Sequence, residues 1–130
     1  MTLLSGFRIL VVEDELLIAL ALEDILLSLD CQVIGPIGNV AEALQLAQTE
    51  PFDGALLDVN VRGQLVYPVA EALMERKVPV IFCSGYSDTA IMPSRFRSLA
   101  QVPKPYDDQV LMVAMERVFQ VSNPTAAHPG

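Results

Sequence analysis

Polar side chains stand at the ends of four apolar segments of this sequence, and together they form a set with recognisable chemistry. Glu13 and Asp14 follow the first segment, Asp58 ends the second, and Ser84 and Lys104 follow the third and fourth. Carboxylates held close together repel one another, and a divalent cation allows all of them to stay ionised. Ligands that are all oxygen favour Mg2+, which uses one or two carboxylates, several waters and phosphate oxygens. The set therefore predicts a magnesium site beside a bound phosphoryl group.

Asp58 is the predicted nucleophile of this site. A carboxylate can attack phosphorus in line and form an acyl phosphate. Such a transfer depends on neutralising the charge of the phosphoryl oxygens more than on a base. We expect Mg2+ to serve one of these oxygens, the Lys104 ammonium a second, and the Ser84 hydroxyl with nearby backbone N–H groups a third.

Each of these residues, taken alone, has a simpler explanation. Glu13 and Asp14 would favour the start of a helix by about 0.3 to 1 kcal/mol through its dipole. Asp58 could cap a turn, Ser84 could satisfy a backbone group at a strand end, and Lys104 could be a solvated loop cation. Their joint placement at four strand ends favours the functional interpretation.

The apolar segments predict the strands that position these residues. Strands are expected at 7–12, 31–34, 52–60, 78–83 and 100–102. In the third of them, Ala55, Leu56 and Leu57 are apolar on both faces, as in a central parallel strand covered by helices. Asp58 lies where this strand ends, and Gly35-Pro36 is expected to end the second strand.

Helical patterns alternate with these strands. Helices are expected at 17–29, from the N-cap Asn39 to Gln48, at 65–76, at 89–99, and onward from the N-cap Asp107. The first helix has apolar residues at three- and four-residue spacing, including Leu17, Ala21, Leu22 and Leu26. Pro68 fits only the first turn of the third helix, and Pro93 interrupts the weakly patterned fourth. Arg62-Gly63 supplies a turn before the third helix.

This alternation predicts an α/β fold, a doubly wound parallel sheet of five strands with five helices. Ligands of such sheets bind beyond the carboxyl ends of the strands. The ends of the first, third, fourth and fifth strands are therefore expected to bring Glu13, Asp14, Asp58, Ser84 and Lys104 together.

Length and composition limit the functions to consider. The 130 residues fit one domain, and 16 acidic residues against 8 basic ones give a net charge of -8. No basic stripe is present to bind phosphates, so nucleic acid is not an expected partner.

Cys31 and Cys83 are expected to be buried thiols that form no disulfide, because no metal or redox spacing links them. No apolar run approaches the ~18 residues that span a bilayer. We expect a cytoplasmic protein without a membrane segment, a domain over 1–121 and a disordered tail over 122–130.

The ordered landmarks Glu13-Asp14, Asp58, Ser84 and Lys104-Pro105 make residues 7–120 resemble the receiver domain of bacterial response regulators. The resemblance implies a flavodoxin-like strand order of 2-1-3-4-5. It also implies that Asp14 binds Mg2+ directly, Glu13 mostly through water, and the backbone carbonyl of Asn60 as a further ligand. Asp58, itself beside the ion, would accept phosphate from a histidine kinase or histidine phosphotransferase. The Lys104-Pro105 bond would be cis.

Two positions depart from the usual pattern of this family. Gln101 stands three positions before the lysine, where the family usually has an aromatic switch residue. The segment Phe82-Cys-Ser-Gly-Tyr86 resembles a variant of receivers, common in alphaproteobacteria, with a Phe-Ala-Thr-Gly-Tyr-like sequence. Tyr86 stands where the family tunes loss of the phosphoryl group, and its bulk would shield the acyl phosphate from water.

The leading hypothesis is a single-domain response regulator that is switched by phosphorylation of Asp58 and signals through protein–protein contacts. It would catalyse no more than its own phosphorylation and dephosphorylation. By the family's example, the surface of the fourth helix, fifth strand and fifth helix would bind a partner or form a homodimer. One alternative is a phosphorylation-independent docking module, which the missing aromatic at Gln101 leaves open. Another is a haloacid dehalogenase type phosphohydrolase, but that class needs its nucleophile after the first strand, with a second Asp two residues on.

Overall fold

The computed structural model describes residues 3–84, 92–97, 99–104 and 107–122. Its centre is a five-stranded parallel sheet in the order β2-β1-β3-β6-β7. The strands are β1 Arg8–Val12, β2 Gln32–Ile37, β3 Gly54–Asp58, β6 Val80–Ser84 and β7 Ala100–Pro103. The helices are α1 Leu16–Ser28, α2 Val40–Thr49, α3 Tyr67–Glu75, α5 Ser94–Arg97 and α6 Asp108–Ser122. Counted along the chain, this is the predicted order 2-1-3-4-5, and the predicted fold class is confirmed.

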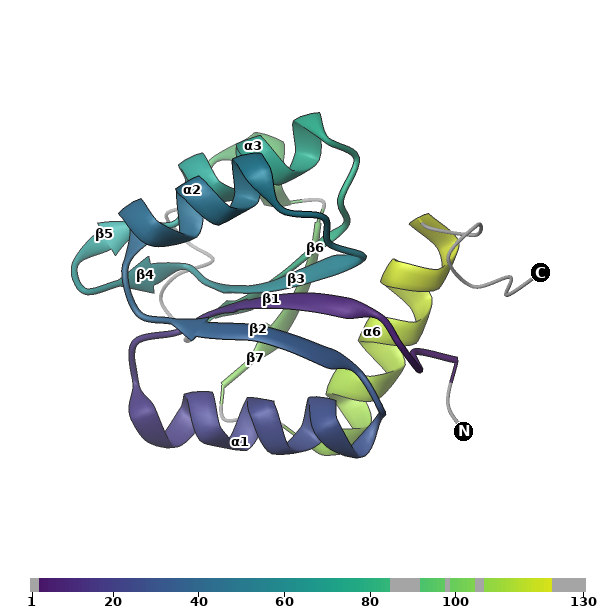
Figure 1. Cartoon of the computed structure of the whole chain (residues 1–130). Coiled ribbons are helices and arrows are strands. Elements are labelled where there is room, and N and C mark those ends of the chain that lie inside the picture. Colours follow the sequence, from purple (N-terminus) through teal and green to yellow (C-terminus); the bar gives the residue numbers. More distant parts are fainter. Residues whose placement is uncertain (1–2, 85–91, 98, 105–106, 123–130) are drawn as a thin grey trace.

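Helices cover both faces of the sheet. Figure 1 shows α2 and α3 over one face and α1 and α6 over the other. Side chains of each strand alternate between the two cores, as the pleat requires. In β1, Leu10 and Val12 join the core under α2 and α3, whereas Ile9 and Val11 join the core over α1 and α6. The sheet is therefore buried on both sides, which explains the continuous apolar runs of its central strands.

Three local signals that the sequence predicts lie at the starts of helices, although the third helix begins at Tyr67 rather than Leu65. The Asn39 side chain accepts a hydrogen bond from the Glu42 N–H at 2.8 Å, which caps α2. Asp107 accepts hydrogen bonds from two backbone N–H groups at the start of α6, at 2.9 and 3.1 Å. Pro68 lies in the first turn of α3, where its missing N–H breaks no helical hydrogen bond. No helix among the described residues is both long and apolar enough to cross a bilayer.

The prediction that Gly35-Pro36 ends the second strand is wrong. β2 runs on to Ile37, with one extra residue opposite β1, because Leu10 pairs with Ile34 and Val12 with Ile37. The Gly35-Pro36 peptide is cis, and Gly35 has a φ of 114°. A Cβ atom at Gly35 would lie 2.6 Å from the Val11 carbonyl oxygen. The bulge takes up the break that the sequence indicates, and pairing resumes beyond it.

The predicted apolar stripe of the first helix is only partly correct. Ala19, Leu22 and Leu26 are the buried residues of α1, whereas Leu17 is 82% exposed and Ala21 is also exposed. α1 has apolar residues almost all round, so their spacing could not define which side faces the sheet. Three of the four exposed leucines of α1, namely Leu16, Leu17 and Leu20, lie in its first turns, whereas Leu27 lies in its last turn.

The predicted fourth helix, 89–99, falls partly outside the described residues. In the part of this segment that the structure describes, the helical residues are those of α5, Ser94–Arg97. Phe96 of α5 is fully buried and stacks on Tyr67 of α3, with ring centroids 4.9 Å apart. Phe96 also meets Phe82 of β6 edge-on at 5.7 Å, and Arg95 forms an ion pair with Glu71. These contacts join α5 to α3 and to the sheet although its sequence carries little helical pattern.

Gly54→Ala is expected to lower the free energy of unfolding by about 1 to 3 kcal/mol, the usual cost of overpacking a core. A Cβ atom at Gly54 would lie 2.7 Å from three ring atoms of Phe119, which is fully buried in α6. Denaturant unfolding of the variant measures the loss. Gly38→Ala is the matched control, since a Cβ there meets nothing closer than 3.5 Å. If the two variants lost equal stability, the close contact with Phe119 would not be the cause.

Candidate functional site

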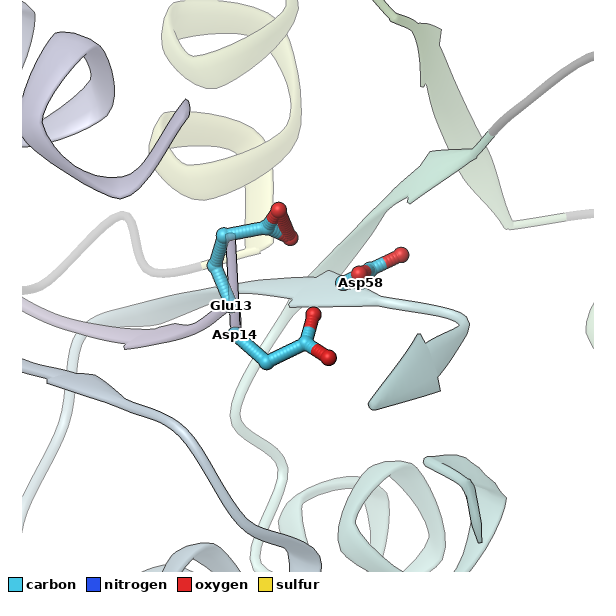
Figure 2. Close-up of side chains that lie close together, drawn as sticks. All are labelled: Glu13, Asp14 and Asp58. Carbon is cyan, nitrogen blue, oxygen red and sulfur yellow. The ribbon is translucent and has the colours of Figure 1, made fainter. Parts of the chain in front are cut away.

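The predicted residues meet at the carboxyl edge of the sheet. Glu13 and Asp14 directly follow β1, Asp58 ends β3, Ser84 ends β6, and Lys104 directly follows β7. One carboxylate oxygen from each of the three acidic residues lies within 4.8 Å of the others. Figure 2 shows the three carboxylates reaching into one region from the ends of two neighbouring strands. Parallel strands bring these residues together although up to 91 positions separate them in the sequence.

Lys104 lies between two of the carboxylates. Its Nζ is 3.1 Å from Asp58 Oδ2 and 3.2 Å from each carboxylate oxygen of Glu13. The Lys104 backbone N–H donates to the Ser84 carbonyl at 3.1 Å, which continues the pairing of β7 with β6 beyond the strand. The lysine side chain is only 14% exposed. Its position is therefore set by the sheet as well as by its charge.

Burial and mutual repulsion perturb the ionisation of this cluster. Burial, then the hydrogen bond and the charge of Asp58, raise the pKa of Glu13 to about 8 against the opposing effect of Lys104. Burial acts to lower the pKa of Lys104, but the hydrogen bonds and charges of Asp58 and Glu13 outweigh it and raise that pKa. The ammonium group of Lys104 therefore does not offset the effects of burial and of Asp58 on the pKa of Glu13. A bound divalent cation would supply the missing positive charge.

A short hairpin that the sequence did not predict completes the edge. β4 Asn60–Val61 pairs antiparallel with β5 Gln64–Leu65, and the predicted Arg62-Gly63 turn joins them. The Arg62 N–H donates to Asp14 Oδ2 at 2.9 Å, and the Gly63 N–H donates to Asn60 Oδ1 at 2.9 Å. The contact with Asp14 links residues 48 positions apart, so no local pattern could have revealed it.

The remaining predicted residues lie around this cluster. Ser84 is buried at the end of β6. Gln101, in β7, is half-buried, and its side-chain Nε2 donates to Met92 Sδ at 3.3 Å. Tyr86 and the Lys104-Pro105 peptide bond lie outside the described residues, as does the tail from 123. Cys31 and Cys83 are both buried and form no disulfide, as predicted.

Comparison with known families assigns this arrangement. The sequence profile of the response regulator receiver domain matches residues 9–116. The chain belongs to the receiver domain family. The match spans the sheet and every charged residue of the cluster, so it rests on the described site as well as on the fold. A phosphohydrolase of the haloacid dehalogenase type finds no support in this assignment.

Solved structures and curated proteins of this kind resemble the receiver domain described here. SdrG from Sphingomonas melonis Fr1 is 42% identical, with a TM-score of 0.76 over 88% of this chain and 96% of that chain. The receiver domain of the sensor histidine kinase PA1611 from Pseudomonas aeruginosa PAO1 is 22% identical, with a TM-score of 0.73 over 88% of this chain and 98% of that chain. That crystal structure has a magnesium ion coordinated in the active site cleft, and its likeness to this chain extends to the fold alone.

The transcriptional regulatory protein PdtaR from Mycobacterium tuberculosis is 27% identical over 113 residues. This stretch is 84% of this chain and 55% of PdtaR. The sensory transduction protein LytR from Staphylococcus saprophyticus is 25% identical over 124 residues, which make up 93% of this chain and 49% of LytR. The chain therefore spans about half the length of the curated relatives it matches.

The donor set of this receiver domain fits a hard divalent cation. All of its candidate ligands are oxygens, and Glu13 and Asp58 are almost fully buried. Such ligands suit Mg2+, which leaves part of its coordination shell to water or phosphate. Burial, and then the hydrogen bond and charge of Asp58, raise the pKa of Glu13, so a cation beside this carboxylate would favour its ionised form.

The pH dependence of Mg2+ binding is expected to follow Glu13. Because the pKa of Glu13 is about 8, Mg2+ must displace its proton below that pH. The affinity should then fall by about tenfold for each pH unit below 8 while one proton is displaced. Titration calorimetry at several pH values measures this slope, and Glu13→Gln should remove it along with part of the affinity. An affinity that does not change between about pH 6.5 and 9 would contradict the prediction.

The stability of the metal-free domain should also depend on the protonation of Glu13. It should fall as the pH rises, whereas the Mg2+ affinity should increase. The folded domain binds the Glu13 proton more tightly than the unfolded chain does, since the pKa rises from 4.5 to about 8. The stabilisation this proton gives is full below pH 4.5 and is lost as the pH rises through 8. Lys104 titrates above this window, because its pKa is raised from 10.5.

Proposed function

We propose that this receiver domain is a phosphorylation switch that accepts a phosphoryl group on Asp58 in the presence of Mg2+. The observation that carries the proposal is the position of Lys104 Nζ, 3.1 Å from Asp58 Oδ2 inside a cluster of three carboxylates. The donor would be the phosphohistidine of a histidine kinase or a histidine phosphotransferase. The output would be protein–protein contact made by the phosphorylated domain, and we propose that it acts in the cytoplasm.

The transfer would use each residue of the cluster in one way. A carboxylate oxygen of Asp58 forms the new bond to phosphorus, the bond from phosphorus to the donor nitrogen breaks, and the imidazole keeps that electron pair. Asp14, Glu13, Asp58 and the Asn60 carbonyl would hold Mg2+, which supplies positive charge against the phosphoryl oxygens. Lys104 already contacts Asp58, so its ammonium needs only a short movement to reach a phosphoryl oxygen. The Ser84 hydroxyl, at the end of the adjacent strand, would donate to another.

Added charge is what would make the product a switch. A phosphoryl group brings about -1.5 to -2 charge to a cluster that already lacks positive charge. Lys104 and Ser84 would be drawn toward it, and both belong to the β6–β7 side of the sheet. The half-buried Gln101 of β7 and its neighbour Met92 lie on that side too. We propose that the surface of α5, β7 and α6 carries the signal or forms a homodimer.

Exposed apolar residues on two helices support contact with protein partners. Leu16, Leu17 and Leu20 are 70%, 82% and 47% exposed on α1, directly after the acidic pair. Val110 and Val113 of α6 are about half exposed and line an open cavity of about 380 Å³. A protein that delivers a phosphoryl group to Asp58 must approach this edge of the sheet, so we propose that it contacts the first turns of α1.

Intact-mass measurement of the wild-type domain with a small acyl-phosphate or phosphoramidate donor tests the proposal. We expect a single phosphoryl adduct that forms with Mg2+ and is absent when Mg2+ is chelated. A domain that is folded but gains no adduct from any donor, a cognate kinase included, would overturn the switch. That result would favour the phosphorylation-independent docking module instead.

A further inference from the structure

We infer that the β4–β5 hairpin is a positioning element of the metal site, holding the Asp14 carboxylate in its ligating orientation through the Arg62 N–H. The inference rests on the proposed Mg2+ site and adds residues to it. Gly63 and the Asn60 side chain act here as positioning residues, because they touch neither the metal nor the phosphoryl group. Figure 1 shows the hairpin at the end of the sheet where α2 begins.

The contact with Asp14 fixes a carboxylate that burial alone does not hold. Asp14 is only partly buried, unlike Glu13 and Asp58. Its Oδ2 accepts the Arg62 N–H at 2.9 Å, which restrains rotation of the carboxylate about its Cβ–Cγ bond. A ligand restrained in this way loses less freedom when it binds a metal ion, and its orientation is set before the ion arrives.

The direction of the Arg62 N–H depends on the turn. Arg62 and Gly63 have φ values of 51° and 79°, the two positive values of a type I′ turn. The Gly63 N–H is held by Asn60 Oδ1 at 2.9 Å. The Arg62 guanidinium lies against Gly38 in the loop after β2, where a Cβ would be 3.5 Å from it. The turn is thus fixed by its own backbone, by Asn60 and by the neighbouring loop.

The same geometry leaves the Asn60 carbonyl available. The Val66 N–H bonds to the Val59 carbonyl at 2.9 Å, just below the hairpin. Antiparallel pairs alternate between bonded and non-bonded, so the adjacent Asn60–Leu65 pair is a non-bonded one. The Asn60 carbonyl therefore accepts no hydrogen bond between the two strands of the hairpin. The Asn60 side-chain oxygen accepts the hydrogen bond from the Gly63 N–H. One hairpin both orients one candidate ligand and presents another.

Two glycine variants separate this role from a general effect on stability. Gly63 and Gly6 have nearly equal φ values, 79° and 82°, and a Cβ on either would meet no atom within 4 Å. Gly63→Ala and Gly6→Ala therefore impose the same backbone strain, one in the hairpin and the other in the turn before β1. Both variants should lose similar stability in denaturant unfolding without metal.

Titration of each folded variant with Mg2+ alone, followed by calorimetry, is the test. We expect Gly63→Ala to bind Mg2+ roughly tenfold more weakly than the wild type, the lower range for lost support of a metal ligand. Gly6→Ala should bind as the wild type does.

Asn60→Ala keeps the backbone carbonyl and removes only the hydrogen bond to the Gly63 N–H. This variant should also bind Mg2+ more weakly, and it replaces Gly63→Ala in the test if Gly63→Ala does not fold. Wild-type affinity in both hairpin variants would overturn the inference. A wild-type domain that binds no Mg2+ would instead refute the metal site itself.

Discussion

Asp58→Asn is expected to abolish the phosphoryl adduct, because an amide does not attack phosphorus as a carboxylate does. The substitution keeps the size of the side chain and leaves an oxygen that can still accept from Lys104 Nζ, 3.1 Å away in the wild type. The variant should therefore fold with the same sheet. Intact mass after incubation with Mg2+ and a small phosphoryl donor measures the loss directly.

The same substitution should change the electrostatics of the cluster in a defined direction. Asp58 raises the pKa of Glu13 through both its hydrogen bond and its charge, so that pKa should fall toward its ordinary value in the variant. The stability that the metal-free domain loses as its Glu13 deprotonates should therefore be lost at a lower pH in the variant than in the wild type. Denaturant unfolding in the presence of a chelator compares the two.

Asp30→Asn is the matched control for this variant. Asp30 lies in the turn between α1 and β2, at the other edge of the sheet, where its φ of 67° suits asparagine as well. Its Oδ2 accepts from the Ser5 hydroxyl, and an amide oxygen can do the same. The control should form the wild-type adduct. An adduct that persisted on Asp58→Asn would mean that another residue accepts the phosphoryl group.

Lys104→Met is expected to slow adduct formation by a factor on the order of 10² to 10³, the usual effect of removing one group that stabilises transition-state charge. Methionine keeps much of the apolar stem and removes the ammonium. Glu13 and Asp58 would then share the site without their common partner, so the pKa of Glu13 should rise further. The time course of the adduct at saturating Mg2+ measures the rate.

Lys77→Met controls for the loss of a lysine charge. Lys77 is the only other lysine in the sequence, and it lies exposed between α3 and β6, away from the carboxyl edge. Its replacement should leave the rate unchanged. Equal rates for Lys104→Met and the wild type, with Mg2+ still bound, would show that Lys104 has only a structural role.

The predicted parts of the fold depended on signals that act over short distances. Apolar runs marked all five strands of the sheet, and Asn39 and Asp107 marked the starts of two helices. The amphipathic pattern failed in α1, because a helix that is apolar almost all round does not reveal which side faces the sheet. The expectation that Gly35-Pro36 ends the second strand also failed, because a bulge carries β2 on to Ile37.

The sequence by itself determined which residues would meet at the candidate site. Glu13, Asp58 and Lys104 each stand at a strand end, and parallel topology brings such ends to one edge whatever lies between them. Only the tertiary structure decided how the site is supported. The bond from Arg62 to Asp14 and the packing of Phe119 on Gly54 join segments that share no local pattern. Periodicity and caps encode the type of each element, whereas contacts between elements depend on how their surfaces pack once the chain is folded.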